Sequence, residues 1–335
     1  MIASTERGQR GINRVLAKLE HSINTGNYYE AHQMYRTLYF RYIAQRKYFE
    51  CMDLLYTGAL RLVRNAQEPS AADLGLLIVD TLEKSGHRTN IELWIERLSA
   101  LIENLSPTTV ERETLINRCI KWSGEVSGHN LGHPSLHKRI ARLLWSEGNM
   151  EQARHHVLLC RDGNMCGRFL VKISEKKSYT SEVDLIIVQA VLQQLCLKDR
   201  KTAEETFTTY IRQHPDIKRK AAPYKEILLN FIYFLFLCID ISHSAAFRSL
   251  CDLYKPSLDR DPSFQKYLVK IGVLFFDINP TPPSSGANMN MMGGMFGDLF
   301  SRLFQGFDDD DENNELPQGR EHGDGDGSHI SHELD

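Results

Sequence analysis

The residues that come closest to a metal site are His155, His156, Cys160 and Cys166. Imidazole nitrogens and thiolate sulfurs are the ligands that zinc prefers in proteins. The spacing matches neither a zinc finger nor a zinc ribbon, and His156 and Cys160 fall where one face of a helix would be buried. We therefore expect packing residues here, with no bound metal and no cofactor.

A second segment with chemical potential runs from Ser127 to Pro134 and contains two glycines and two histidines. Glycines can cradle a phosphate, but this segment lacks the Lys-Ser/Thr ending of a phosphate-binding loop and a preceding strand. A connection between two helices is the better interpretation. Nucleophilic catalysis would need a Ser or Cys with a base and an oxyanion site, and no such motif is present. We expect no catalytic residues and a protein that is not an enzyme.

Basic and aromatic residues alternate over residues 35–48. Such a pattern can bind single-stranded nucleic acid, because bases stack on aromatic rings. Helical phase, however, places Tyr35, Leu38 and Tyr42 on one side. The residues expected around the other side are Arg36, Arg46 and either Tyr39 or Phe40. This favours a helix that buries one face and offers a basic face to a protein, so we expect no nucleic-acid partner, with an RNA-binding helical repeat as the alternative.

The elements that carry these residues are helices, because apolar residues recur at spacings of three and four throughout the sequence. The periodicity predicts helices over residues 12–24, 28–42, 48–63, 71–84, 90–105, 108–122, 135–146, 150–160, 181–197, 203–213, 224–241, 245–254 and 264–276. Ser70 is expected to cap the fourth helix, and Ser106-Pro107 to separate two others. No convincing run of alternating apolar and polar residues predicts a strand, so the predicted fold is all-α.

Gly26-Asn27 and Gly148-Asn149 each precede a helix with a nearby alanine, Ala31 and Ala153. This resembles the tetratricopeptide helical hairpin, in which small residues let neighbouring helices approach. The roughly 34-residue period of that repeat is absent, so an irregular α-solenoid of such hairpins is expected. The apolar run 227–241 is shorter than the roughly 20 residues of a membrane span, and we interpret it as a fully buried helix.

The C-terminal region has a different composition from the rest. Residues 279–335 carry twelve acidic and two basic residues, whereas residues 1–278 carry 38 basic and 31 acidic ones. Low complexity and acidity predict a disordered tail over 280–335. Within it, segment 289–307 is expected either to fold as a docking helix in a partner's groove or to pack back on the protein itself. Its anchors would be Met295, Phe296, Leu299, Phe300, Leu303 and Phe304.

Seven cysteines are scattered along the chain with no Cys-x-x-Cys pair. An odd number of unpatterned cysteines indicates reduced thiols, and the charged N-terminal segment does not resemble a secretory leader. We therefore expect a cytosolic protein without direct membrane insertion.

Specific segments give this sequence a family resemblance. Residues 26–38, Gly-Asn-Tyr-Tyr-Glu-Ala-His-Gln-Met-Tyr-Arg-Thr-Leu, together with residues 48–60, resemble the N-terminal signature of the Golgi-to-ER traffic protein 4 family. The resemblance continues through Ala72-Asp73-Leu74, His133-Pro134 and residues 272–276, and so covers essentially the whole chain. It implies a cytosolic adaptor in the targeting of tail-anchored membrane proteins to the endoplasmic reticulum.

The resemblance also implies where partners bind. The N-terminal half of the α-solenoid, residues 1–150, would contact the targeting ATPase, and the matching positions are His32, Arg36, Arg41 and Asp73. The C-terminal half, residues 151–279, would hold a ubiquitin-like adaptor and, as in animals, a BAG-domain scaffold protein. Fungal members of the family use a hairpin insertion for adaptor binding, and no clear strand pair is expected between Tyr254 and Phe264. The tail resembles that of animal members, which favours the assembly with the BAG-domain scaffold. A generic helical-repeat scaffold of another cytosolic complex is the alternative.

Overall fold

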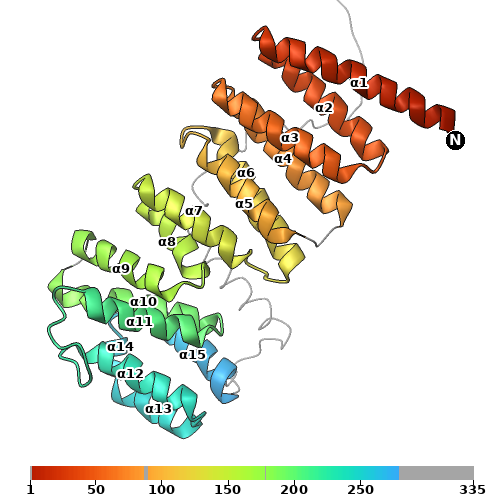
Figure 1. The fold of residues 1–335 in the computed structure, drawn as a ribbon. Coiled ribbons are helices and arrows are strands. Elements are labelled where there is room, and N and C mark those ends of the chain that lie inside the picture. Colours follow the sequence, from red (N-terminus) through yellow and green to blue (C-terminus); the bar gives the residue numbers. More distant parts are fainter. Residues whose placement is uncertain (1, 87–89, 178, 279–335) are drawn as a thin grey trace, which may run out of the picture. The chain divides into compact units, whose positions relative to one another are not determined.

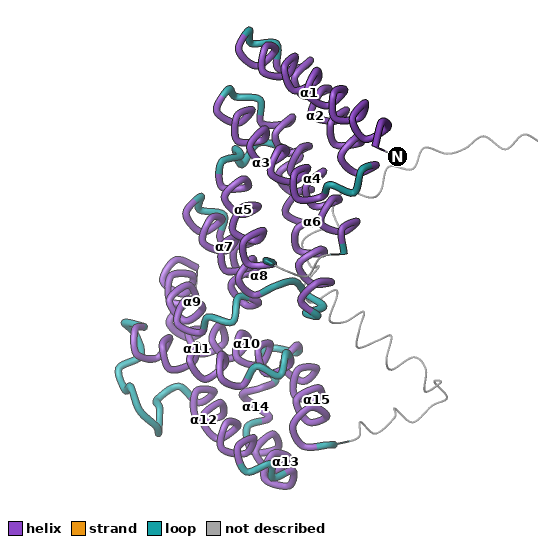
Figure 2. The backbone as a smooth tube through the Cα atoms, turned by 45° about the vertical axis from the view of Figure 1, so that its right-hand side comes forward, coloured by secondary structure: helices purple, strands orange, loops and turns teal. Residues whose placement is uncertain are grey.

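The computed structural model describes residues 2–86, 90–177 and 179–278, and throughout these ranges the regular elements are helices (Figures 1 and 2). The elements are α1 (Ile2–Asn24), α2 (Tyr28–Ala44), α3 (Tyr48–Arg64), α4 (Glu68–Ser85), α5 (Ile91–Glu103), α6 (Val110–Ser127), α7 (Pro134–Ser146), α8 (Met150–Leu159), α9 (Gly163–Lys177), a short 3-10 turn η1 (Thr180–Glu182), α10 (Val183–Cys196), α11 (Arg200–Gln213), α12 (Ile227–Asp240), α13 (Ser244–Leu253), α14 (Lys255–Leu258) and α15 (Ser263–Phe276). The all-α prediction is confirmed. The predicted tail, 280–335, with its docking helix at 289–307, lies outside the described residues.

The first eight helices form successive hairpins: α1 packs on α2, α3 on α4, α5 on α6 and α7 on α8. Each hairpin also lies against the next one, because α2 packs on α4, α4 on α6, α3 on α5 and α5 on α7 (Figure 1). A helix in this arrangement is covered by its hairpin partner and by the helix two places along the chain. This is the packing of an α-solenoid, as the sequence predicts.

The two Gly-Asn turns build equivalent hairpin starts. Gly26 and Gly148 adopt positive φ angles of 76° and 81°, a conformation that costs glycine little. The following asparagines occupy the N-cap position of α2 and α8, and both Ala31 and Ala153 are fully buried. The buried alanines agree with the prediction of small residues at the start of each hairpin, whereas Gly26 and Gly148 serve the turn, because an added Cβ atom on either would meet no neighbouring atom.

The succession of hairpins changes at α10. Eleven of its fourteen residues are buried, including the polar Asp184, Gln193 and Gln194. The helix is in contact with α8, α9, α11, α12 and α15, so the last helices gather around it instead of continuing as a simple row. The Gln193 side-chain amide donates a hydrogen bond of 3.0 Å to the Tyr267 hydroxyl on α15. This contact ties the end of the described chain back to its middle.

Two helices were missing from the sequence prediction, α9 and the single turn α14. In α9, Gly163 and Gly167 lower the intrinsic helix propensity and hide the pattern. The structure shows why glycine is present: a Cβ atom on Gly167 would lie 2.9 Å from the Thr206 carbonyl oxygen and 2.7 Å from the Thr209 Cβ. The backbone of α9 therefore packs directly on α11, and this tertiary contact overrides local propensity.

Other local predictions need correction. The fourth helix begins at Glu68 with Gln67 as its N-cap, so Ser70 lies inside the first turn and does not cap it.

Tyr39 was one of two alternatives for the side of the second helix opposite its apolar stripe, but it is 2% exposed. The reason is that α2 is covered by α1 and α3 and also by α4, so its buried face is wider than a single stripe. The other alternative, Phe40, is the exposed one. Residues 128–133 connect α6 and α7, as expected.

All seven cysteines are free thiols, and six of them are buried within the helices or at a helix end. They are spread along the stack at Cys51, Cys119, Cys160, Cys166, Cys196 and Cys238. Burial raises the pKa of the Cys51 thiol to about 11 and that of the Cys196 thiol to about 12. These groups therefore remain protonated at neutral pH and behave as small apolar packing residues.

A pair of histidines is enclosed in the α7–α8 hairpin. The Nδ1 atoms of His137 and His156 lie 2.8 Å apart, and Nε2 of His137 lies 2.6 Å from the Leu131 carbonyl oxygen. Because a carbonyl only accepts, His137 donates from Nε2, and its Nδ1 accepts the N–H of His156. Burial lowers the pKa of His137 to about 4 and that of His156 well below its ordinary value, and the neighbouring His155 lowers both further.

Replacing Gly167 with alanine tests the α9–α11 contact. We expect Gly167→Ala to lower the free energy of unfolding by about 1–3 kcal/mol, because the new methyl group meets backbone oxygen and a packed side chain. The matched control is Gly11→Ala on α1, where the nearest atom is the flexible Arg41 guanidinium at 3.4 Å. There the substitution should stabilise by up to about 1 kcal/mol through helix propensity. Equal effects in denaturant titrations would contradict the close contact.

The buried histidine pair predicts a loss of stability in acid. Both imidazoles stay neutral in the folded protein, whereas in the unfolded chain they bind protons near pH ~6.5. The unfolded state therefore binds more protons below that pH, and the free energy of unfolding falls as the pH drops toward about 4, the pKa of folded His137. We expect thermal melting from pH 7 to 5 to show a shallower decline in His156→Leu than in the intact protein. His21→Gln, at an exposed histidine of α1, should leave the decline unchanged.

Candidate protein-interaction surfaces

Three of the residues weighed as zinc ligands, His156, Cys160 and Cys166, form hydrogen bonds within the protein. Cys166 is fully buried between helices, and its sulfur accepts a hydrogen bond of 3.5 Å from the Gln194 side chain. Burial raises the pKa of this thiol to about 12, so it is protonated at neutral pH and packs as an apolar group. The Cys160 thiol donates to the Val157 carbonyl oxygen at 3.2 Å. Within the described ranges, no three His, Cys, Asp or Glu side chains converge as metal ligands would.

Three of the four residues singled out for partner binding meet between α2 and α4. Nε2 of His32 lies 2.7 Å from a carboxylate oxygen of Asp73, and the Arg36 guanidinium lies 2.8 Å from the other oxygen. These residues are separated by about 40 positions in the sequence, and helix stacking brings them together. We refer to His32, Arg36 and Asp73 as the α2–α4 ion cluster.

The ion cluster stays charged and is open to solvent on one side. Burial alone would raise the pKa of Asp73, but the hydrogen bond from His32 and the positive charge of Arg36 hold it below its ordinary value. The side chains of Arg36 and Asp73 are 39% and 29% exposed. A partner protein can therefore reach both signs of charge at the same place.

Arg41 lies apart from this cluster. Its guanidinium donates a hydrogen bond of 2.9 Å to the Gly11 carbonyl oxygen on α1. Arg41 follows Arg36 by five positions, so the two side chains leave α2 in different directions. The four expected residues thus divide into a group of three and a separate arginine.

A second polar cluster, missed from the sequence, extends the charged surface of α4. The Tyr39 hydroxyl donates to Asp80, and the Lys84 ammonium lies 2.6 Å from the same carboxylate and 2.7 Å from the tyrosine oxygen. Burial is the main cause that raises the pKa of Tyr39. Asp80 and Lys84 are four positions apart, which is the one signal in the sequence that could have indicated this group.

Two exposed aromatic side chains flank the ion cluster on α2. Tyr29 is 77% exposed and Phe40 is 62% exposed. They precede and follow Arg36 by seven and four residues, which places all three on one side of the helix. Large apolar side chains in water beside paired charges are typical of protein-interaction sites. Phe40 was one of two alternatives expected on the partner-facing side of this helix, whereas Tyr29 was not among the candidates predicted from the sequence.

The prediction that residues 227–241 form a fully buried helix is wrong in one respect. Several residues of α12 bury completely, but an apolar stripe remains exposed, at Ile227 (57%), Phe234 (43%), Leu237 (45%) and Ile241 (67%). The first, second and fourth are spaced by seven, so they share one face. Within the described part, no helix is long and apolar enough to cross a membrane. We call these four residues the α12 stripe.

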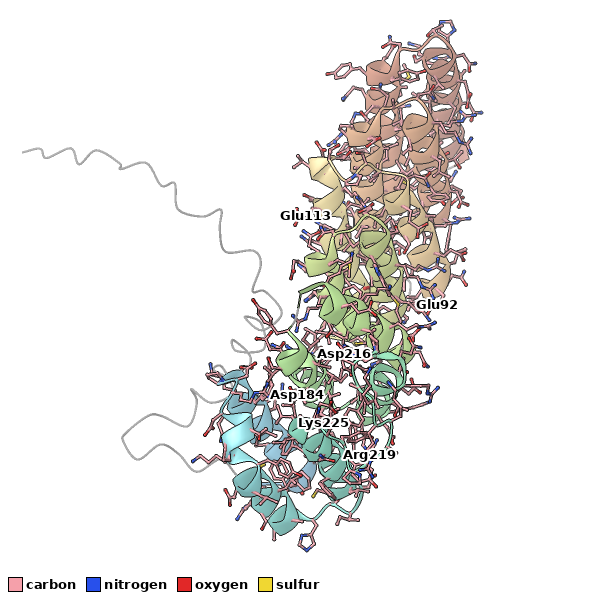
Figure 3. All side chains as sticks on the ribbon, turned by 90° about the vertical axis from the view of Figure 1, so that its left-hand side faces the viewer. Glu92, Glu113, Asp184, Asp216, Arg219 and Lys225 are labelled. Atoms are coloured by element: carbon pink, nitrogen blue, oxygen red, sulfur yellow. The ribbon has the colours of Figure 1, made fainter. Side chains whose placement is uncertain are left out.

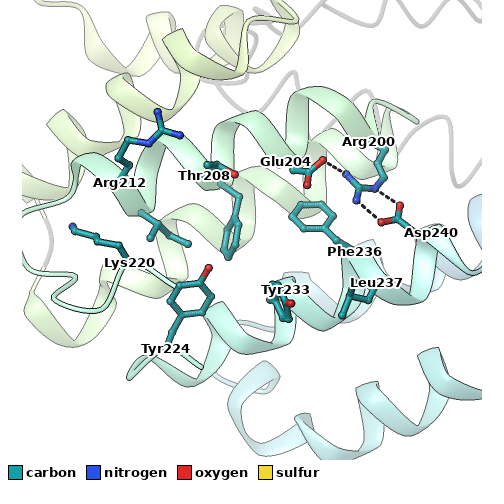
Figure 4. A pocket seen from close by; sticks show the side chains of 12 residues that line it. Arg200, Glu204, Thr208, Arg212, Lys220, Tyr224, Tyr233, Phe236, Leu237 and Asp240 are labelled. Atoms are coloured by element: carbon teal, nitrogen blue, oxygen red, sulfur yellow. Dashed lines mark hydrogen bonds and ion pairs between the residues drawn. The ribbon is translucent and has the colours of Figure 1, made fainter. Parts of the chain in front are cut away.

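A groove of about 360 Å³ lies between α11 and α12, next to the α12 stripe (Figure 4). Aromatic rings line it, and they belong to Phe207, Tyr224, Tyr233 and Phe236. At one end, Arg200 forms ion pairs with Glu204 at 2.7 Å and with Asp240 at 2.8 Å. Arg212 and Lys220 lie at the other end (Figure 4).

The loop that joins α11 to α12 is rich in basic residues. Over residues 214–226 it carries four of them, Lys218, Arg219, Lys220 and Lys225, against Asp216 and Glu226. Figure 3 labels Asp216, Arg219 and Lys225 in this region. Burial and the neighbouring Lys218 lower the pKa of Lys220. The groove therefore opens beside a surface that favours negative charge.

Known proteins of one family match this chain over most of its length. The family model described as "Golgi to ER traffic protein 4" matches residues 45–300. The Golgi to ER traffic protein 4 homolog of Xenopus tropicalis is 44% identical over 305 residues, covering 91% of this chain and 91% of the relative. The Homo sapiens homolog is 43% identical over 305 residues, covering 91% and 90%.

A solved structure has the same fold. The crystal structure of C. therm. Get4 superposes with a TM-score of 0.73 and 24% sequence identity. It covers 86% of this chain and 96% of that one. At this level of identity, the likeness concerns the arrangement of the helices.

Truncating two phenylalanines of α12 tests the exposure of the stripe. Phe231 is fully buried and Phe234 is 43% exposed, so the same substitution in the same helix should differ strongly. We expect Phe231→Ala to lower the free energy of unfolding by about 3–5 kcal/mol and Phe234→Ala by only about 1 kcal/mol. Urea titrations give both values, and similar losses would mean that Phe234 packs as part of the core.

Proposed function

Because the chain belongs to the Golgi to ER traffic protein 4 family, we propose that it is a non-catalytic adaptor in the delivery of tail-anchored membrane proteins to the endoplasmic reticulum. Its N-terminal half, residues 1–150, holds the targeting ATPase. Its C-terminal half, residues 151–279, holds a ubiquitin-like adaptor and a BAG-domain scaffold protein. The protein works in the cytosol and brings the ATPase to the complex that carries the client.

The observation that carries this proposal is the presence of two surfaces of different chemistry on separate helices. One is the charged and aromatic surface of α2 and α4, and the other is the apolar α12 stripe. Each can bind its own partner, because no residue belongs to both. An adaptor needs two independent surfaces on one scaffold, whereas an enzyme needs groups that converge on one reacting atom.

The N-terminal surface suits a partner that must bind and leave. Exposed ion pairs contribute little affinity individually, are screened by salt, and mainly raise the association rate. Tyr29 and Phe40 add apolar area on both sides of Arg36. A charged rim with a few large aromatic contacts fits a transient complex with the ATPase.

The C-terminal surface suits a partner that stays bound. The α12 stripe offers apolar side chains whose burial is not weakened by the ionic screening that acts on the ion cluster. Solenoids need a polar outer face on their terminal repeats for solubility. An apolar terminal face covered by the adaptor or the scaffold meets that need.

The charges of the ion cluster test the N-terminal contact. We expect Arg36→Glu to weaken capture of the targeting ATPase by roughly tenfold at low salt, since one attractive contact becomes repulsive. The ubiquitin-like adaptor and the scaffold should remain bound. Affinity is measured by biolayer interferometry with the full chain at two salt concentrations.

A charge swap separates recognition from folding. Arg36→Asp combined with Asp73→Arg keeps an ion pair between α2 and α4 but exchanges the positions of its charges. Capture should stay weak if the partner recognises each charge. Recovery of full affinity would mean that the pair only supports packing. Arg61→Glu is the control, because Arg61 forms a similarly exposed ion pair with Glu20 between α1 and α3.

A further inference from the structure

We infer that the groove between α11 and α12 is a docking site for a peptide segment of a partner protein in which a large apolar side chain is followed by carboxylates. The inference rests on the proposed function, since it locates one contact of the C-terminal half and names its chemistry. The occupant is an acidic peptide with an aromatic or leucine anchor.

The walls of the groove suit an apolar anchor. Phe207 stacks edge-on against Phe236 with ring centroids 5.8 Å apart, and against Tyr224 at 5.9 Å. Tyr233 and Leu237 on the α12 side are 38% and 45% exposed, so they have apolar surface left to bury. The volume of about 360 Å³ is at the small end of the ~300–1,000 Å³ range of ligand pockets, which fits one or two side chains.

The charges of the groove select an acidic partner. Both of its carboxylates, Glu204 and Asp240, are already paired with Arg200. Arg212 and Lys220 at the opposite end therefore set the sign of the remaining charge, and the loop with Lys218 and Arg219 adds to it. Glu226 offsets part of the positive charge at Lys220, but the basic residues outnumber the acidic ones at this end, so an incoming carboxylate meets a net positive surface.

The geometry of Lys220 supports the same conclusion. Its ammonium donates a hydrogen bond of 2.6 Å to the His214 carbonyl oxygen, which leaves further donors for a ligand. Burial and the nearby Lys218 make its charge unfavourable in the free protein. A carboxylate bound between Lys218 and Lys220 would offset the repulsion between their positive charges. Binding of the carboxylate therefore stabilises the charged form of Lys220.

The arrangement gives the peptide a direction. Its apolar anchor lies on Tyr233 and Leu237, and its carboxylates reach toward Arg212 and Lys220 (Figure 4). A nucleic acid would carry its charges along the whole groove and would meet Glu204 and Asp240 at the far end. The mixed ends of the groove favour the peptide.

Fluorescence anisotropy with three synthetic peptides and the full-length chain tests this inference. The probe is a labelled helical peptide with Phe and Leu anchors followed by Asp and Glu. In the first control peptide the acidic residues are replaced by lysine, and in the second the anchors are replaced by serine. We expect the acidic probe to bind at least roughly tenfold more tightly than either control, and less tightly as salt is raised.

Variants of the chain then locate the site. Tyr233→Ala with Leu237→Ser should weaken binding of the acidic probe by roughly tenfold, and Arg212→Glu with Lys220→Glu should reverse the preference between acidic and lysine peptides. All four side chains are exposed, and melting curves verify that each variant folds. The matched control is Leu253→Ser on α13, an exposed apolar side chain that neither lines the groove nor belongs to the α12 stripe, and it should bind as the intact chain does.

Several results would overturn the inference. Equal binding of the acidic and lysine peptides would remove the charge selection, and unchanged binding by both groove variants would place the peptide elsewhere. Tighter binding of a single-stranded RNA, lost in Arg212→Glu with Lys220→Glu, would assign the groove to nucleic acid. The peptides contain no part of the ATPase, so this outcome is independent of the Arg36 capture experiment, and either proposal can fail alone.

Discussion

Double coverage of each helix is the constraint on which the structure depends. A helix in the row packs on its hairpin neighbour and on the helix two places along the chain, so it needs a wide apolar face. The helix α4 meets this need with eight buried residues in eighteen. Helix α10 has the widest buried face, because eleven of its fourteen residues are buried and their side chains are apolar or hydrogen bonded. The exposed apolar side chains of α12 lie on the sides of that helix that α10, α13 and α14 leave uncovered.

Ion pairs between helices are a second recurring contact in the structure. Charged side chains join helices that are two places apart, as in Glu20 with Arg61, Asp53 with Arg97, and Glu83 with Arg118. Exposed pairs of this kind each contribute up to about 1 kcal/mol, so they set register more than they supply stability. Asp73 belongs to the same class, and it also faces solvent. A partner can exchange such weak pairs for its own without unfolding the scaffold.

Periodicity and turn chemistry predicted most of this fold. The apolar spacing found most of the helices to within a few residues, and Gly26 and Gly148 marked the turns. Gly163 and Gly167 hid α9, because only the backbone of α11 explains why a helix contains them. Apolar content alone could not show that Phe234 is exposed while Phe231 is buried, since that depends on which sides α10 and α13 cover.

The candidate surfaces were less predictable. Residues 32, 36 and 73 were selected through family resemblance, and nothing in their spacing indicates that they touch. Phe40 was one of two alternatives for the side of α2 opposite its apolar stripe, and Tyr29 could have been recognised in the same way. The groove between α11 and α12 draws on residues from two helices and a loop, so its shape follows from tertiary packing and from no local pattern.

The buried cysteine thiols can report where the protein unfolds locally. Cys51, Cys119, Cys160, Cys196 and Cys238 sample α3, α6, the end of α8, α10 and α12 in turn. A thiol reacts with an alkylating reagent only as an accessible thiolate, so each of these sulfurs is labelled when its own part of the stack opens. The order of labelling along the sequence would distinguish a stack that frays from one end from a stack that opens as a unit. No probe would have to be introduced, because each hairpin from α3–α4 to α7–α8 already carries a buried thiol, as do α10 and α12.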